Sequence, residues 1–139
     1  MKRKSAWVLI ACASAVLIFY PFPSTGFLYR NAGVLKGRAS HIMGASMAFG
    51  LDPSFYYKFK ISPWDFDEAA AALGLRKSQS RDYEIWMMRM HGPLFWNSWW
   101  WRPGDGTGAI LYSGNREGNN FYFLYNPKTQ MAYLYIQNT

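Results

Sequence analysis

Only two histidines, His41 and His91, are available for general acid–base chemistry. Neither is spaced as a metal ligand or adjoins a pair of carboxylates, and a zinc site needs three or four such ligands. A hydrolase would have to assemble its site from residues apart in the chain, for example His91 with Asp82 or Glu84. We therefore predict no catalytic residue, no metal and no cofactor, and keep a cell-envelope hydrolase with a dispersed site as the alternative.

Two other groups of residues resemble sites but have simpler explanations. Asp65, Asp67 and Glu68 lie in the first turns of an expected helix, where carboxylates compensate the positive helix end. The run GDGTG at 104–108 has the glycines of a phosphate loop but lacks the lysine and the helix that follow one. We interpret the first group as helix capping and the second as a turn.

The residues best suited to recognition are aromatic. Four tryptophans lie within residues 94–101: Trp96, Trp99, Trp100 and Trp101. In an extended segment Trp100 would point to one side and its two neighbours to the other, and we expect Trp99 and Trp101 to be the more exposed. The broad face and polar edge of Trp and Tyr suit a glycan, a peptide or a membrane interface. The candidate binding residues are Trp99, Trp101, Trp96 and Tyr112.

The stretch SPWDFDEAAAALGL at 62–75 carries the signals of a short helix. Ser62 suits the N-cap, Pro63 the first helical position, and Asp65 a capping box. Gly74 can adopt the left-handed conformation that ends a helix, with Leu75 folding back onto the last turn. The apolar residues fall on one face at spacings of three and four: Phe66, Ala69, Ala70 and Leu73. This face requires a sheet to cover it.

Strand-like runs lie before this helix. Residues 54–61, SFYYKFKI, alternate between an apolar row and a row containing two lysines, which predicts a half-buried strand. We interpret residues 38–49 as its antiparallel partner across a turn at 50–53, with a helix as the alternative. These two segments predict an N-terminal hairpin.

Further strand-like runs lie after the helix. Residues 76–81 read as a loop, and 80–90 as a second short helix or an irregular aromatic segment. Three strands follow at 109–113, 119–125 and 130–137, with turns at 114–118 and 126–129. The prediction is an α+β fold in which an antiparallel sheet, formed by the N-terminal hairpin and a C-terminal three-stranded meander, carries the capped helix on one face.

Residues 1–26 have the three parts of an export signal: a basic start, an apolar run and a polar end containing proline. The apolar run is about 15 residues, which lies between a signal core and a membrane span of about 20. Three fates remain open: an uncleaved anchor involving residues 6–22, cleavage after Gly26, and lipidation at Cys12. In each, the basic start stays in the cytoplasm and the rest is translocated. We expect a linker at 27–37 and a globular domain at 38–139.

Composition excludes several classes of protein. Half of the chain is apolar and 19% is aromatic, enough for a substantial core and against disorder. The single cysteine excludes an intramolecular disulfide. Three of the 15 basic residues lie in the export signal, which leaves 12 against 8 acidic residues. Because the remaining basic residues are scattered, we expect no nucleic-acid partner.

The order of four motifs over residues 52–139 resembles a type of small exported bacterial single-domain protein without an assigned function. The motifs are DPSFYYKFK, an SP-initiated helix ending in LGL, WWWRP and LYNPKTQMAYLY. Many members of this type look like lipoproteins or single-span membrane proteins. The resemblance implies export and one α+β domain, and it implies no chemistry.

Together these patterns predict an exported or membrane-tethered binding module that acts outside the cytoplasm and is not an enzyme. Its partner is expected to be an envelope protein or a glycan. A structural or immunity-type partner of a membrane complex is the further alternative.

Overall fold

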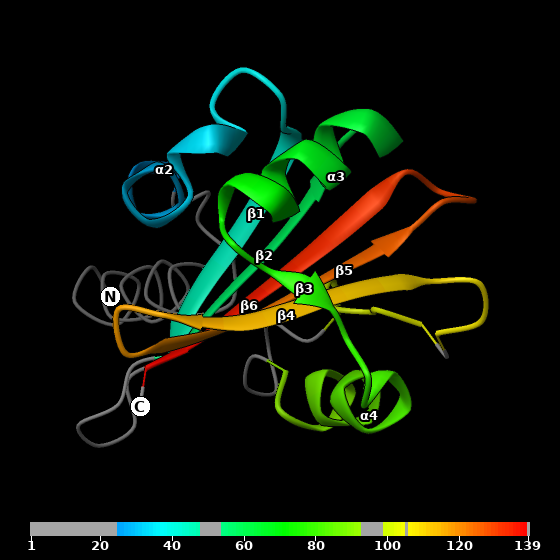
Figure 1. Ribbon diagram of the computed structural model, residues 1–139. Helices are drawn as coiled ribbons and strands as arrows, with labels where there is room; N and C mark the ends of the chain where they lie inside the picture. Colours follow the sequence, from blue (N-terminus) through cyan, green and yellow to red (C-terminus); the bar gives the residue numbers. More distant parts are fainter. Residues whose placement is uncertain (1–24, 48–53, 93–98, 105, 139) are drawn as a thin grey trace, which may run out of the picture.

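A computed structural model describes residues 25–47, 54–92, 99–104 and 106–138 of the chain (Figure 1). These residues form an α+β fold whose antiparallel sheet has six strands in the order β1-β2-β6-β5-β4-β3. The predicted α+β class and antiparallel sheet are confirmed. The expected turn at 50–53 and residues 1–24 of the expected export signal lie outside the described residues, whereas Thr25 and Gly26 begin a helix.

The strands are β1 (Ser40–Met47), β2 (Ser54–Lys60), β3 (Arg76–Lys77), β4 (Ile110–Arg116), β5 (Asn119–Asn126) and β6 (Met131–Asn138). The helices are α2 (Thr25–Asn31), the short 3-10 helix η1 (Gly33–Leu35), α3 (Pro63–Ala72) and α4 (Arg81–Met90). β2 pairs with β1 on one side and with β6 on the other, and β5 lies between β6 and β4.

Helices cover both faces of this sheet. In Figure 1, α2 and α3 lie on one side of the strands and α4 on the other. Strand β2 shows the consequence: Tyr57 and Phe59 join the core beneath α2 and α3, whereas Tyr56 joins the core beneath α4. Tyr56 and Tyr57 are 2% and 1% exposed. The expectation of a half-buried strand is therefore wrong for Tyr56, because α4 and residues 99–104 cover the second face.

Local hydrogen bonds define both ends of α3. Ser62 Oγ accepts a hydrogen bond from the backbone N–H of Asp65 at 3.1 Å and donates one to the Asp65 carboxylate at 2.7 Å. At the other end the N–H groups of Gly74 and Leu75 donate to the carbonyls of Ala71 and Ala70, a Schellman arrangement made possible by a φ of +72° at Gly74. These caps satisfy backbone groups that a helix leaves unpaired.

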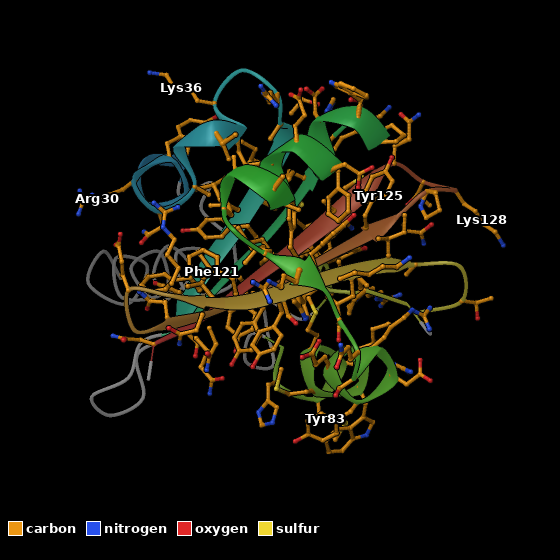
Figure 2. The ribbon with its side chains drawn as sticks, in the orientation of Figure 1. Arg30, Lys36, Tyr83, Phe121, Tyr125 and Lys128 are labelled. Atoms are coloured by element: carbon orange, nitrogen blue, oxygen red, sulfur yellow. The ribbon has the colours of Figure 1, made fainter. Side chains whose placement is uncertain are left out.

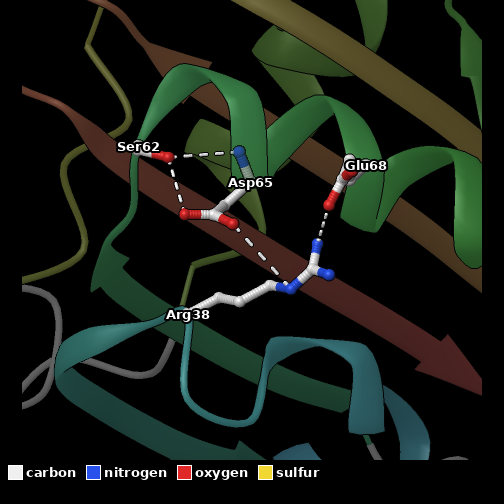
Figure 3. A network of polar contacts seen from close by, with 4 residues as sticks. All are labelled: Arg38, Ser62, Asp65 and Glu68. Carbon is white, nitrogen blue, oxygen red and sulfur yellow. Dashed lines mark hydrogen bonds and ion pairs between the residues drawn. The ribbon is translucent and has the colours of Figure 1, made fainter.

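Arg38 fastens α3 to the segment that precedes β1. Its Nε lies 3.8 Å from Asp65 Oδ1, and its Nη1 pairs with Glu68 (Figure 3). The acidic residues at the start of α3 thus serve an ion pair as well as the helix end. The expected apolar face is buried against the sheet: Phe66, Ala69 and Ala70 of α3, and Leu73 at its C-cap.

Three expected boundaries differ from the structure. Residues 27–37, expected to be a linker, are largely helical and bury Leu28, Ala32 and Leu35 completely, because they cover the sheet beside α3. Residues 76–81, expected to be a loop, begin with β3, which pairs with β4. The expected turn at 114–118 is confined to the two residues between β4 and β5, both with positive φ, as a tight hairpin requires.

Two segments left open by the sequence are now assigned. Residues 40–47 form a strand, as favoured over the helical alternative, and residues 81–90 form the helix α4.

Gly114 lies inside β4 where Leu75 approaches closely, since a Cβ at this position would lie 3.2 Å from Leu75 Cδ2. The glycine that indicated a turn therefore serves packing.

Candidate binding surface

The structure describes three of the four candidate binding residues and does not bring them to one surface. Trp96 lies outside the described residues. Trp99 is 54% exposed, as expected. Trp101 is only 5% exposed, so the prediction that it is exposed with Trp99 is wrong, and Trp100 is 1% exposed. The strict alternation fails because residues 99–104 are irregular and not an extended strand.

Tyr112 lies on the opposite face of the sheet from Trp101. Its ring contacts Phe66 of α3 at a centroid distance of 5.6 Å, and its hydroxyl donates to Asp67 Oδ1 at 3.1 Å. Burial and the hydrogen bond to the nearby Asp67 carboxylate raise the pKa of Tyr112 above its usual value. Tyr112 therefore belongs to the packing of α3 and does not extend a tryptophan surface.

Trp101 is held firmly in the core beneath α4. Its indole ring makes edge contacts with Tyr56 and Tyr133 at centroid distances of 5.2 and 5.5 Å. Its Nε1–H donates to the carbonyl oxygen of Met88 at 2.9 Å. A Cβ on Gly92 would lie 2.6 Å from Trp101 Cδ1, so the ring also requires a glycine there. These contacts leave the indole in one position.

A pocket of about 330 Å³ opens beside this ring, within the size range of small-ligand sites. It is hereafter called the basic pocket, and its lining residues are Arg89, Trp101, Arg102, Pro103 and Gly104. Arg89 belongs to α4 and Arg102 to the segment after the tryptophans, so the fold brings two arginines that lie apart in the chain to one pocket.

A third cation lies close to this pocket. Lys58 Nζ is 5.6 Å from the centroid of the Tyr133 ring. The Tyr133 ring in turn contacts Trp101, which lines the pocket. Burial, followed by the positive charge of Arg102, lowers the pKa of Lys58. Burial and the positive charge of Arg102 therefore both disfavour the charged form of Lys58.

Three of the large exposed hydrophobic side chains in the described part of the chain lie on α4, and they define what is hereafter called its outer face: Tyr83, Trp86 and Met90. These side chains are 65%, 52% and 65% exposed. The Tyr83 and Trp86 rings stack at a centroid distance of 5.9 Å with 29° between their planes. Figure 2 shows Tyr83 on the side of α4 that points away from the sheet. The inner face, in contrast, buries Ile85 and Met88.

Polar contacts hold the start of α4 on the sheet. Arg81 Nε donates to the carbonyl of Ala109 at 3.1 Å, and its Nη2 donates to the carbonyl of Gly106. Glu84 accepts from Ser113 Oγ of β4 at 3.2 Å. These contacts fix the start of α4, and the hydrogen bond from Trp101 to Met88 fixes its last turn, so the orientation of the outer face relative to the sheet is defined.

Sequence reasoning missed the outer face of α4, although a signal for it exists. Tyr83, Trp86 and Met90 have the spacing i, i+3, i+7, which places them on one side of any helix. The spacing alone does not distinguish an inner from an outer face, since Ile85 and Met88 also lie three residues apart. The basic pocket has no such signal, because its two arginines come together only through the packing of Trp101.

The residues considered for catalysis lie apart. Asp82 and His91 are at opposite ends of α4, separated by about 13 Å along its axis, and Glu84 is separated from His91 by about 10 Å. His41 is exposed at an irregularity of the edge strand β1, beside Ser40. Among the described residues, no group of three or more His, Cys, Asp or Glu is placed to hold a metal ion.

Comparison of the chain with protein-family models, curated proteins and solved structures found no match. Within the described part of the chain, each helix is too short or too polar to cross a membrane.

Proposed function

We propose that this chain is a non-catalytic binding module that acts outside the cytoplasm, tethered to the membrane or exported, and that it binds an envelope protein through the outer face of α4. The observation that carries this proposal is the exposure of Tyr83, Trp86 and Met90 on one side of a helix whose other side is buried.

The composition of the outer face supports a protein partner. Aromatic residues, Met and Arg are enriched at the centres of protein interfaces, and Trp, Tyr and Arg dominate their binding energy. The outer face has Tyr83, Trp86 and Met90, and Arg89 borders it as the neighbour three residues after Trp86. The spacing i, i+3, i+7 is that of a helix bound in an apolar groove.

A scaffold and a location complete the proposal. We infer that a hairpin of β1 and β2, the meander of β4, β5 and β6, and the capped helix α3 form the frame that presents α4. The basic start and the apolar run of residues 1–26 support translocation of this domain. A C-terminal alkaline phosphatase fusion should then be active and a C-terminal GFP fusion dark, whereas the opposite pattern would reject the extracytoplasmic location.

A capture experiment tests the binding surface. The tagged chain, purified from solubilised envelope, should retain a partner that is lost from the Trp86→Ala variant. Trp64→Ala is the matched control, because Trp64 is 72% exposed on α3, across the sheet from α4. Equal capture by all three chains, or equal loss in both variants, would show that the outer face of α4 is not the binding surface.

A further inference from the structure

The basic pocket combines a rigid aromatic wall with two guanidinium groups. Trp101 supplies the wall, and its position is fixed by the hydrogen bond to Met88 and by close contact with Gly92. Arg89 and Arg102 reach the pocket from α4 and from the segment after Trp101. A site of this kind is preorganised because its shape exists before any ligand enters.

The described residues supply no ion-pair partner for the two arginines of this pocket. Neither Arg89 nor Arg102 forms an ion pair with them, whereas Arg38 and Arg81 pair with carboxylates. The depressed pKa of nearby Lys58 follows from burial and the charge of Arg102. An anion bound at the pocket would compensate this concentration of positive charge.

The pocket chemistry distinguishes among anions. A guanidinium group binds carboxylate or phosphate through two parallel N–H donors. A carboxylate has only two oxygens for two guanidinium groups to share, so a ligand with more oxygens and more negative charge suits the pair better. A phosphate monoester offers three terminal oxygens and a charge of about −1.5 to −2 at neutral pH.

We propose that the basic pocket binds a phosphate group between the guanidinium groups of Arg89 and Arg102, against the ring of Trp101. The site adjoins the outer face of α4 at Arg89, but its ligand requires no protein partner. The phosphate belongs either to a small soluble ester or to a lipid headgroup, and both sources present the same oxygens to the two arginines.

Calorimetric titration of the full-length chain in a neutral detergent tests this proposal. The probes are inorganic phosphate, micelles doped with a phosphatidic acid, and acetate at matched ionic strength. Arg102→Gln should weaken phosphate binding about tenfold to a hundredfold. Lys128→Gln removes the same charge from the exposed β5–β6 turn and should leave binding unchanged. Circular dichroism confirms that each variant is folded, and Arg89→Gln replaces Arg102→Gln if that variant is not.

A second readout uses the unmodified chain. Because phosphate would offset the charge of Arg102, saturation should raise the pKa of Lys58, measured from the NMR signal of its side chain. Binding of free phosphate supports a soluble ester, and binding of doped micelles alone supports a lipid headgroup. Absence of binding to both probes, acetate binding as tight as phosphate, or equal losses in the Arg102 and Lys128 variants would overturn the proposal.

Discussion

The indole N–H of Trp101 donates a hydrogen bond to the main-chain carbonyl oxygen of Met88. Met88 lies in the last turn of α4, where carbonyl groups have no partner within the helix. One side chain therefore completes the hydrogen bonding of the helix end and forms a wall of the basic pocket. The outer face of α4 and the pocket are held by the same contact.

Trp101 and Trp99 should respond differently to truncation. Trp101→Ala removes a buried ring and its hydrogen bond, and we expect a loss of about 3–5 kcal/mol in the free energy of unfolding. Trp99→Ala should change it by no more than about 0.5 kcal/mol, because that side chain is exposed. Denaturant melts measure both, and similar losses in the two variants would contradict the placement of Trp99 at the surface.

The ends and the buried face of α3 contribute unequally to stability. Ser62→Ala removes the N-cap acceptor and should cost about 1 kcal/mol. Leu73→Ala leaves a cavity beneath the helix and should cost about 2–5 kcal/mol. A denaturant series in which the serine variant is the less stable of the two would mean that the buried face of α3 is assigned wrongly.

Buried tyrosines should make the fold sensitive to alkali. Burial raises the pKa of five tyrosines above the ordinary 10.0, so the folded chain retains protons that the unfolded chain releases: Tyr56, Tyr112, Tyr122, Tyr125 and Tyr133. The contribution of these tyrosines to the free energy of unfolding is fully present below pH 10. It is lost as the pH rises from there through their pKa values in the folded chain. Lys58 changes stability in the opposite direction. Because its pKa is lowered in the folded chain, its positive charge destabilises the fold, and this destabilisation disappears as the pH rises towards 10.5.

With five tyrosines opposing one lysine, the free energy of unfolding should fall above pH 10. Denaturant melts across this range measure it, and Tyr56→Phe should show a shallower fall because one of the groups no longer titrates. A free energy of unfolding that stays constant or rises above pH 10 would contradict the assigned burial.

Local signals and long-range contacts explain which features the sequence predicts. The helix α3 is predictable because its caps and its buried face lie within fourteen consecutive residues, from Ser62 to Leu75. The cover that α4 and residues 99–104 form over the second face of the sheet is not predictable in this way. Trp101 is buried there through contacts with Tyr56, Met88 and Tyr133, which lie on three other elements. Likewise, Leu28 has no local signal for burial and enters the core only because the sheet beside α3 needs cover.

The most direct test of the central claim, that the outer face of α4 binds an envelope protein, is photo-cross-linking in intact cells. A photoreactive amino acid at the position of Trp86 should produce a discrete adduct between the chain and another protein. The same group at the position of Trp64, which is even more exposed and lies on the other side of the sheet, should produce none. No adduct at position 86, or the same adduct at both positions, would contradict the claim.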